Sequence, residues 1–173
     1  MSSRSTSVRL HYALVGSIGG LAIASGASAN SGTATFELPK LKVKTYHKPY
    51  TAIWIEDTKG KQIKVYRVFY DQSNIGKRWL PDLKTWWRRG GRAMTMPVSG
   101  VSRPSRGPGQ YKVNLGSLSS LPAGKYSFVV EAAREKGGRE IVKVPFTLSR
   151  GKAASGSAAG SSELGKVTVS IKG

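Results

Sequence analysis

Residues 50–70 read YTAIWIEDTKGKQIKVYRVFY, and this stretch decides the fold. Tyr50–Glu56 is apolar on both of its faces, as is typical of a strand that is covered on both sides. Gln62–Tyr70 is rich in β-branched and aromatic residues, which favour strands. Residues 57–60 form a turn, because Asp57 can open it and Gly60 can adopt a positive φ. The stretch therefore predicts a β-hairpin, and its apolar centre predicts that Trp54 is buried.

Alternating apolar and polar residues on both sides of this hairpin predict five more strands. The predicted strands are 33–43, which should be an edge strand or end at Pro39, and 110–115, 125–133, 139–148 and 164–172. There is no alternation of strands and helices, no Gly-rich dinucleotide loop and no phosphate-binding loop in the sequence. We therefore expect an all-β fold, namely an immunoglobulin-like antiparallel β-sandwich of about seven strands with one short helix inserted.

The one predicted helix is Leu80–Arg89, with Pro81 in its first turn and Gly90-Gly91 after its end. Leu83, Trp86 and Trp87 fall on one face of this helix. One interpretation is that the indole rings dock the helix on the sandwich. The other is that they form a stacking platform for a planar ligand, and the two are compatible if one ring is buried and the other exposed.

The ends of the chain carry two further signals. Residues 1–29 have the features of a cleavable signal peptide: Arg4 and Arg9 come first, an apolar run follows at 13–24, and Ala27-Ser28-Ala29 is a cleavage site. The apolar run is shorter than the roughly 20 residues that a membrane-spanning helix needs. The mature chain, residues 30–173, is predicted to be one periplasmic domain without a transmembrane segment. Within it, the Gly/Ala/Ser-rich run 149–162 predicts a flexible loop before the last strand.

The composition limits the possible functions. The chain has no Cys, so it has no disulfide and no thiol nucleophile, and only His47 remains after signal cleavage. We therefore expect no enzymatic activity and no metal site. Cleavage lowers the net charge from +19 to +17. Export argues against nucleic acid as the partner and favours an anionic envelope component or a membrane protein, although charge also serves solubility alone.

The candidate binding residues lie in the stretch 77–110, which is basic and contains three of the four tryptophans. Arg88, Arg89 and Arg92 are candidates for binding an anion or a partner. In the loop 97–109, Arg103 and Arg106 flank Ser105 between two prolines that restrict the backbone.

Several phrases carry a family resemblance. They are PYTAIWIED (49–57), RWLPDLKTWWRR (78–89), PAGKYSFVVEAARE (122–135), GGRE (137–140) and SSELGKVTV (161–169). Together they resemble the bacterial predicted-periplasmic family known as domain of unknown function 2271, over about residues 38–171. The shorter phrase LPAGKYSFVVEA (121–132) also resembles a strand entry of the immunoglobulin-like modules in flagellar hook-capping proteins, which concerns the fold only.

The family resemblance implies a second possible function, that of a flavin carrier in extracytoplasmic electron transfer. Where this chain reads PVSGVSRPSR (97–106), the family commonly resembles PVDGVTGATR, whose final Thr is similar to the acceptor of a flavin mononucleotide (FMN) phosphoester. Ser105 takes the acceptor position and Ser102 that of the first Thr, whereas Ser99 replaces the Asp and Arg103-Pro104 replace Gly-Ala. The resemblance implies a covalent FMN on Ser105, with Ser102, Arg103 and Arg106 nearby and Trp86 or Trp87 stacked on the ring.

Overall fold

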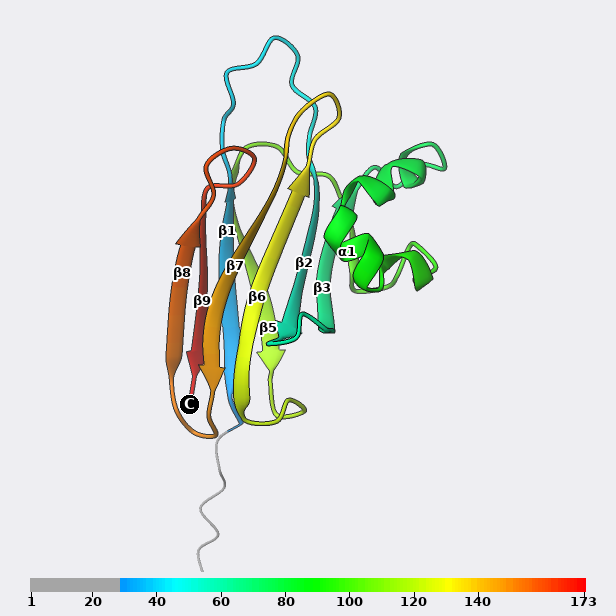
Figure 1. The fold of residues 1–173 in the computed structure, drawn as a ribbon. Helices are drawn as coiled ribbons and strands as arrows, with labels where there is room; N and C mark the ends of the chain where they lie inside the picture. Colours follow the sequence, from blue (N-terminus) through cyan, green and yellow to red (C-terminus); the bar gives the residue numbers. More distant parts are fainter. Residues whose placement is uncertain (1–28) are drawn as a thin grey trace, which may run out of the picture.

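Two β-sheets lie face to face in the computed structural model, which describes residues 29–173 (Figure 1). The predicted signal peptide, apart from Ala29, lies outside the described residues. The first sheet has the order β5 (Gly109–Ser117), β1 (Ser31–Leu38), β9 (Lys166–Lys172) and β8 (Ala154–Ala159). The second has the order β4 (Ser102–Pro104), β3 (Gln62–Tyr70), β2 (Tyr50–Asp57), β6 (Gly124–Ala133) and β7 (Arg139–Leu148).

The predicted β-sandwich is confirmed, with nine strands in the described residues where about seven were expected. The two additional strands are β4 and β8, and β4 pairs in parallel with the end of β3 while every other pair is antiparallel. β1 ends at Leu38, before Pro39, as predicted. The immunoglobulin-like topology stays a prediction.

The core between the sheets follows from the alternation in the strands. Along β1 every second residue is buried, ending with Phe36 and Leu38. β2 differs, because its residues Thr51–Glu56 are all buried. One face of β2 belongs to the core between the sheets, and the other face, which carries Trp54, belongs to a second apolar cluster on the outside of the second sheet. The prediction of a strand covered on both sides, with Trp54 buried, is confirmed.

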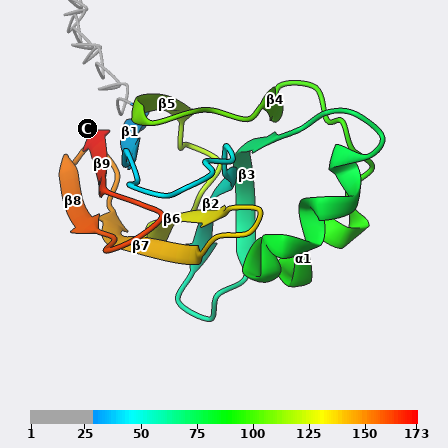
Figure 2. The ribbon, with the colours of Figure 1, turned by 90° about the horizontal axis from the view of Figure 1, so that it is seen from above.

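A helical insertion, defined here as residues 76–93, covers the outer face of the second sheet (Figures 1 and 2). It consists of a 3-10 helix, η1 (Gly76–Asp82), a short α-helix, α1 (Lys84–Arg89), and a second 3-10 turn, η2 (Gly91–Ala93). Leu83 and Trp86 are fully buried and pack with Trp54 in the outer cluster. The insertion is therefore part of the hydrophobic structure of the domain.

The prediction of one continuous helix over Leu80–Arg89 is wrong at its start. Leu83 has a non-helical ψ of 66° and separates η1 from α1, and Pro81 lies inside η1. The physical reason is a buried acceptor on the sheet: the carboxylate of Glu131 takes the backbone N–H groups of Thr85 and Trp86, at 3.0 Å and 2.7 Å. These N–H groups have no partner within the helix, so the helix begins where the carboxylate meets them.

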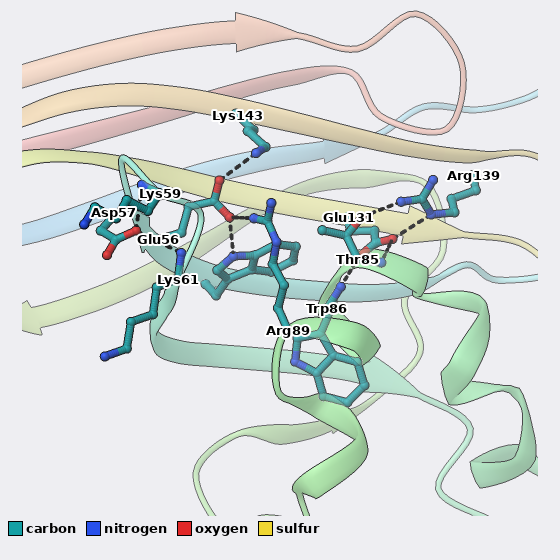
Figure 3. A network of polar contacts seen from close by, with 11 residues as sticks. Glu56, Asp57, Lys59, Lys61, Thr85, Trp86, Arg89, Glu131, Arg139 and Lys143 are labelled. Atoms are coloured by element: carbon teal, nitrogen blue, oxygen red, sulfur yellow. Dashed lines mark hydrogen bonds and ion pairs between the residues drawn. The ribbon is translucent and has the colours of Figure 1, made fainter.

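Glu131 is fully buried on β6 and has one further partner (Figure 3). Arg139, at the start of β7, donates from Nε to the Glu131 carboxylate at 2.6 Å and from Nη2 to Thr85 Oγ1 at 2.6 Å. A buried charge is tolerated only when it is paired and hydrogen-bonded, and here every donor comes from the insertion or the neighbouring strand. Glu131 thereby fixes the position of α1 on the sheet.

The prediction of a flexible loop over 149–162 is wrong for Ala154–Ala159, which forms β8 and pairs with β9. The run lacks large alternating residues because β8 lies close against β7. A Cβ on Gly156 would come within 2.9 Å of Pro145 O and of Val144 Cγ1. Small side chains are required at this approach, and they remove the periodicity on which the sequence prediction depended.

The turn of the central hairpin forms as its sequence predicts. Asp57 Oδ1 accepts hydrogen bonds from the backbone N–H groups of Lys59 and Lys61, both at 2.9 Å. Gly60 has a φ of +76°. This left-handed conformation favours Gly over residues with a side chain.

The dependence of the insertion on Glu131 can be measured. We expect Glu131→Leu to lower the free energy of unfolding by about 3–5 kcal/mol, because two helix N–H groups and the Arg139 guanidinium lose a buried acceptor. Glu135→Gln is a matched control on the same hairpin, since Glu135 is about half exposed, and it should change the value by less than about 0.5 kcal/mol. Chemical denaturation followed by fluorescence gives both values, and equal effects would contradict the role of Glu131.

Candidate functional site

A cavity of about 580 Å³ lies at the end of the sandwich where several segments from different parts of the chain meet. The loop before β2 contributes Tyr46 and His47, the turn after β6 contributes Glu135, and η1 contributes Trp79. The segment after β4 contributes Ser105. We call it the loop-end cavity. Its volume is in the range of small-molecule sites in proteins.

Two polar atoms in the wall of the loop-end cavity have no hydrogen-bond partner among the described residues. They are Ser105 Oγ and His47 Nε2, and both atoms are buried. The other ring nitrogen, His47 Nδ1, lies 3.4 Å from a carboxylate oxygen of Glu135. Buried polar atoms generally have a hydrogen-bond partner, so a bound molecule could supply the partner of each of these two atoms.

Tyr50 forms part of the floor of the cavity and is held by the insertion. Its hydroxyl donates to the backbone carbonyl of Gly76 at 2.8 Å. Burial raises the pKa of Tyr50 above its ordinary value, and the nearby carboxylates of Asp71, Glu135 and Asp82 raise it further. The hydroxyl therefore stays protonated, and these three carboxylates lie within electrostatic reach of one point.

Trp79 is the tryptophan that is available to a ligand. It is 51% exposed and lines the cavity with Ile75, which is 68% exposed; these are the two most exposed large apolar side chains of the described residues. Trp86 is fully buried, and Trp87 is half-buried beside it, with 6.1 Å between their ring centroids. Trp86 thus docks the insertion on the sandwich and has no exposed face for stacking.

The residues of the predicted flavin loop lie along the edge of the second sheet. Ser102 is buried, and its Oγ accepts the backbone N–H of Val98 at 2.9 Å. Arg103 donates from Nη1 to the carbonyl of Ser102 at 2.7 Å, and Arg106 stands over the ring of Tyr111 at 5.9 Å. Ser105 is held by its backbone N–H, which donates to Tyr70 O at 3.1 Å. Of these four predicted cofactor residues, Ser105 alone lines the loop-end cavity, and Trp86 and Trp87 do not.

The predicted anion-binding arginines divide into two kinds. Arg88 and Arg92 are exposed on α1 and η2. Arg89 instead forms an ion pair with the buried carboxylate of Glu56, which also accepts Lys143 Nζ at 2.6 Å and Trp54 Nε1 at 3.0 Å (Figure 3). Arg89 therefore belongs to the contacts that hold the insertion.

Two kinds of site are not found in the described part of the chain. Residues 29–173 contain no group of three or more His, Cys, Asp or Glu side chains that could hold a metal ion. None of their helices has the length and apolar character to cross a membrane.

Sequence reasoning did not find most of the cavity. Trp79 was placed outside the predicted helix, and Tyr46, His47, Asp71 and Glu135 belong to loops without periodicity. One signal was present: these loops combine aromatic, His and acidic residues at the ends of strands, where loops carry binding residues. Which loops meet at the same end depends on the strand order, and that order was not available from the sequence.

Comparison with known proteins identifies one family. Residues 31–166 match the family described as "Predicted periplasmic protein (DUF2271)". No curated protein and no solved structure gives a significant match.

The Glu56 cluster predicts how stability depends on pH. Burial alone would raise the pKa of Glu56, but hydrogen bonds from Lys143, Trp54 and Arg89 outweigh it and lower the pKa below 4.5. The stabilisation is therefore complete above pH 4.5 and is lost as the pH falls through the folded-state pKa. Glu140, whose pKa is also lowered, acts in the same range.

We expect the free energy of unfolding to fall as the pH drops below 4.5, and to fall less steeply in Glu56→Gln, which keeps only the Glu140 contribution. Denaturant titrations across this range measure both slopes. Identical slopes in the two proteins would show that Glu56 has an ordinary pKa.

Proposed function

The chain belongs to the DUF2271 family of predicted periplasmic proteins, and from this we propose that it is a non-enzymatic binding protein that docks on an anionic component of the cell envelope through its helical insertion. One observation carries the proposal. The insertion presents Trp79 next to a set of exposed basic residues, and its one acid is Asp82. We call this set the basic insertion surface: Arg78, Lys84, Arg88 and Arg92.

This combination is typical of proteins that bind at a membrane surface. Lys and Arg are attracted to anionic headgroups, and Trp is favoured at the boundary between headgroups and acyl chains. Trp79 and the neighbouring Ile75 are the apolar part of the surface. Because Glu56 and Glu131 hold the insertion on the sheet, the basic side chains are presented from a fixed framework.

The binding surface differs from the one that the sequence first indicated in two respects. Trp79 replaces Trp86 and Trp87 as the exposed aromatic residue, and Arg89 is committed to Glu56. The expectation of an anionic envelope component, rather than nucleic acid, is retained in the proposal because the family is described as periplasmic.

Binding to lipid vesicles tests this function. We expect the exported protein to sediment with vesicles that contain phosphatidylglycerol and not with vesicles of phosphatidylcholine alone, and binding should weaken as salt is added. Changing the basic insertion surface to Gln at all four positions should lower the partition coefficient ~100-fold or more at low salt, since each basic residue near such a surface contributes about 1 kcal/mol.

A matched control removes the same charge from the opposite side of the molecule. Lys112, Lys152, Lys166 and Lys172 are exposed on or beside the first sheet, and Figure 2 shows β8 and β9 on the side away from α1. Their change to Gln should weaken binding much less. Equal losses in the two variants would mean that net charge alone governs binding, which would contradict docking through the insertion.

The second candidate function is an FMN carrier, and the placement of Ser105 favours it. The Ser105 hydroxyl is at the wall of a cavity that also presents Trp79, so an attached flavin ring could reach an exposed indole. The wall of the cavity is a poor match for the phosphate of FMN. It carries the three carboxylates of Asp71, Asp82 and Glu135, and Lys48 is its one Lys or Arg.

Intact mass decides this second function. After export from cells that contain the flavin transferase, an FMN carrier would show the mass of a phosphoester-linked FMN, and Ser105→Ala would abolish it. An unmodified mass of the unchanged protein, with an acceptor protein from the same cells modified as the control, would exclude the function for this chain.

A further inference from the structure

The acidic residues of this basic protein are distributed unevenly. The chain has nine Asp and Glu residues, all within the described part. Six of their carboxylates accept hydrogen bonds that hold the fold together; they belong to Glu37, Glu56, Asp57, Glu131, Glu140 and Glu163. The other three, Asp71, Asp82 and Glu135, all line the loop-end cavity. Three acids, of which Asp71 alone accepts a hydrogen bond from the fold, are therefore gathered at one place.

These three carboxylates have capacity for a ligand. The carboxylate of Asp82 has no hydrogen bond or ion pair with any other described residue. Asp71 uses Oδ1 to accept the backbone N–H of Ser73 at 3.0 Å. Glu135 is 52% exposed, and one of its carboxylate oxygens lies 3.4 Å from His47 Nδ1. A cation in the cavity would thus find carboxylate oxygens that are not saturated.

The Lys and Arg residues in the wall of the cavity are fewer than its three carboxylates. Lys48 is the one Lys or Arg in its wall. An adjoining depression shares Trp79, Asp82 and Glu135 and adds further basic residues. Two of them are already paired, Arg134 with Glu163 and Arg139 with Glu131, while Lys84 and Lys136 are exposed. Of the two hollows, the loop-end cavity is therefore the acidic one, and the adjoining depression carries the basic residues.

Aromatic side chains complete the site. Trp79 is half exposed, and Tyr46 and Tyr50 share the wall with it. The faces of Trp and Tyr rings attract ammonium and guanidinium groups, most strongly in sites partly shielded from water. The buried His47 Nε2 and Ser105 Oγ add two polar atoms without partners. A metal ion is a poor match, because the acids do not form a metal-binding group.

We propose that the loop-end cavity binds a small organic cation, in which an amine or guanidinium group lies among Asp71, Asp82 and Glu135 and an attached apolar or aromatic group lies against Trp79. The charged residues of this site are different from those of the basic insertion surface, although the two share Trp79. Binding of the cation does not depend on docking at the envelope. Its charge requirement is opposite to that of an FMN phosphate, so the cavity distinguishes cations from anions of the same size.

Three probes that share a phenylethyl group and differ in charge test the selectivity. They are 2-phenylethylamine (a cation), 2-phenylethanol (neutral) and 3-phenylpropanoate (an anion). Each is titrated into the exported protein, and binding is followed by calorimetry and by tryptophan fluorescence. The amine is expected to bind, the alcohol at least ~10-fold more weakly, and the anion not at all. No binding of the amine at millimolar concentration, or binding of the anion as tight as that of the amine, overturns the proposal.

Matched variants locate the site. Asp82→Asn with Glu135→Gln should weaken amine binding by ~10-fold or more and leave alcohol binding unchanged. Asp57→Asn with Glu37→Gln removes the same charge outside the cavity and should leave amine binding unchanged. Equal weakening in both pairs would mean that the amine follows net charge only, and this would also overturn the proposal. The variant without the basic insertion surface should bind the amine at least as tightly as the unchanged protein, because it lacks positive charges that repel a cation. This separates the result from that of the vesicle experiment.

Discussion

The buried carboxylate of Glu131 is the interaction on which the placement of the insertion depends. It stands on β6, accepts the first free N–H groups of α1, and is neutralised by Arg139 from β7. Glu56 repeats the arrangement on β2 with Arg89 from the end of α1. Each end of a helix of six residues is thus held by a glutamate of the sheet. A helix this short has little stability of its own, so its position is set by these contacts and by the burial of Leu83 and Trp86.

The sequence predicted the framework because strands that pack on one or two sides leave a direct pattern. The hairpin 50–70, its turn at Gly60 and the burial of Trp54 all follow from residue type and alternation. β8 was missed because a strand of Gly, Ala and Ser next to another strand has no such pattern. The start of α1 was misplaced because the residue that caps it, Glu131, lies 45 positions from Trp86 in the sequence.

The candidate site was less predictable for the same reason. Ser105 was singled out from a family resemblance, and its hydroxyl does line a cavity. The companions proposed for it, Trp86 and Trp87, are replaced there by Trp79. The sequence showed a strongly basic chain, but the gathering of Asp71, Asp82 and Glu135 requires the strand order that brings the β3–β4 connection next to the β6–β7 turn. Two surfaces of opposite charge thus lie on one insertion, a basic exterior and an acidic cavity beside η1.

The most direct test of this arrangement is amide hydrogen exchange at Thr85 and Trp86 in the exported protein. If Glu131 holds the start of α1, both amides exchange as slowly as the strands β2 and β6, and Glu131→Gln accelerates them while the strands stay protected. Fast exchange of both amides in the unchanged protein, at the rate of the exposed loops, would contradict the arrangement.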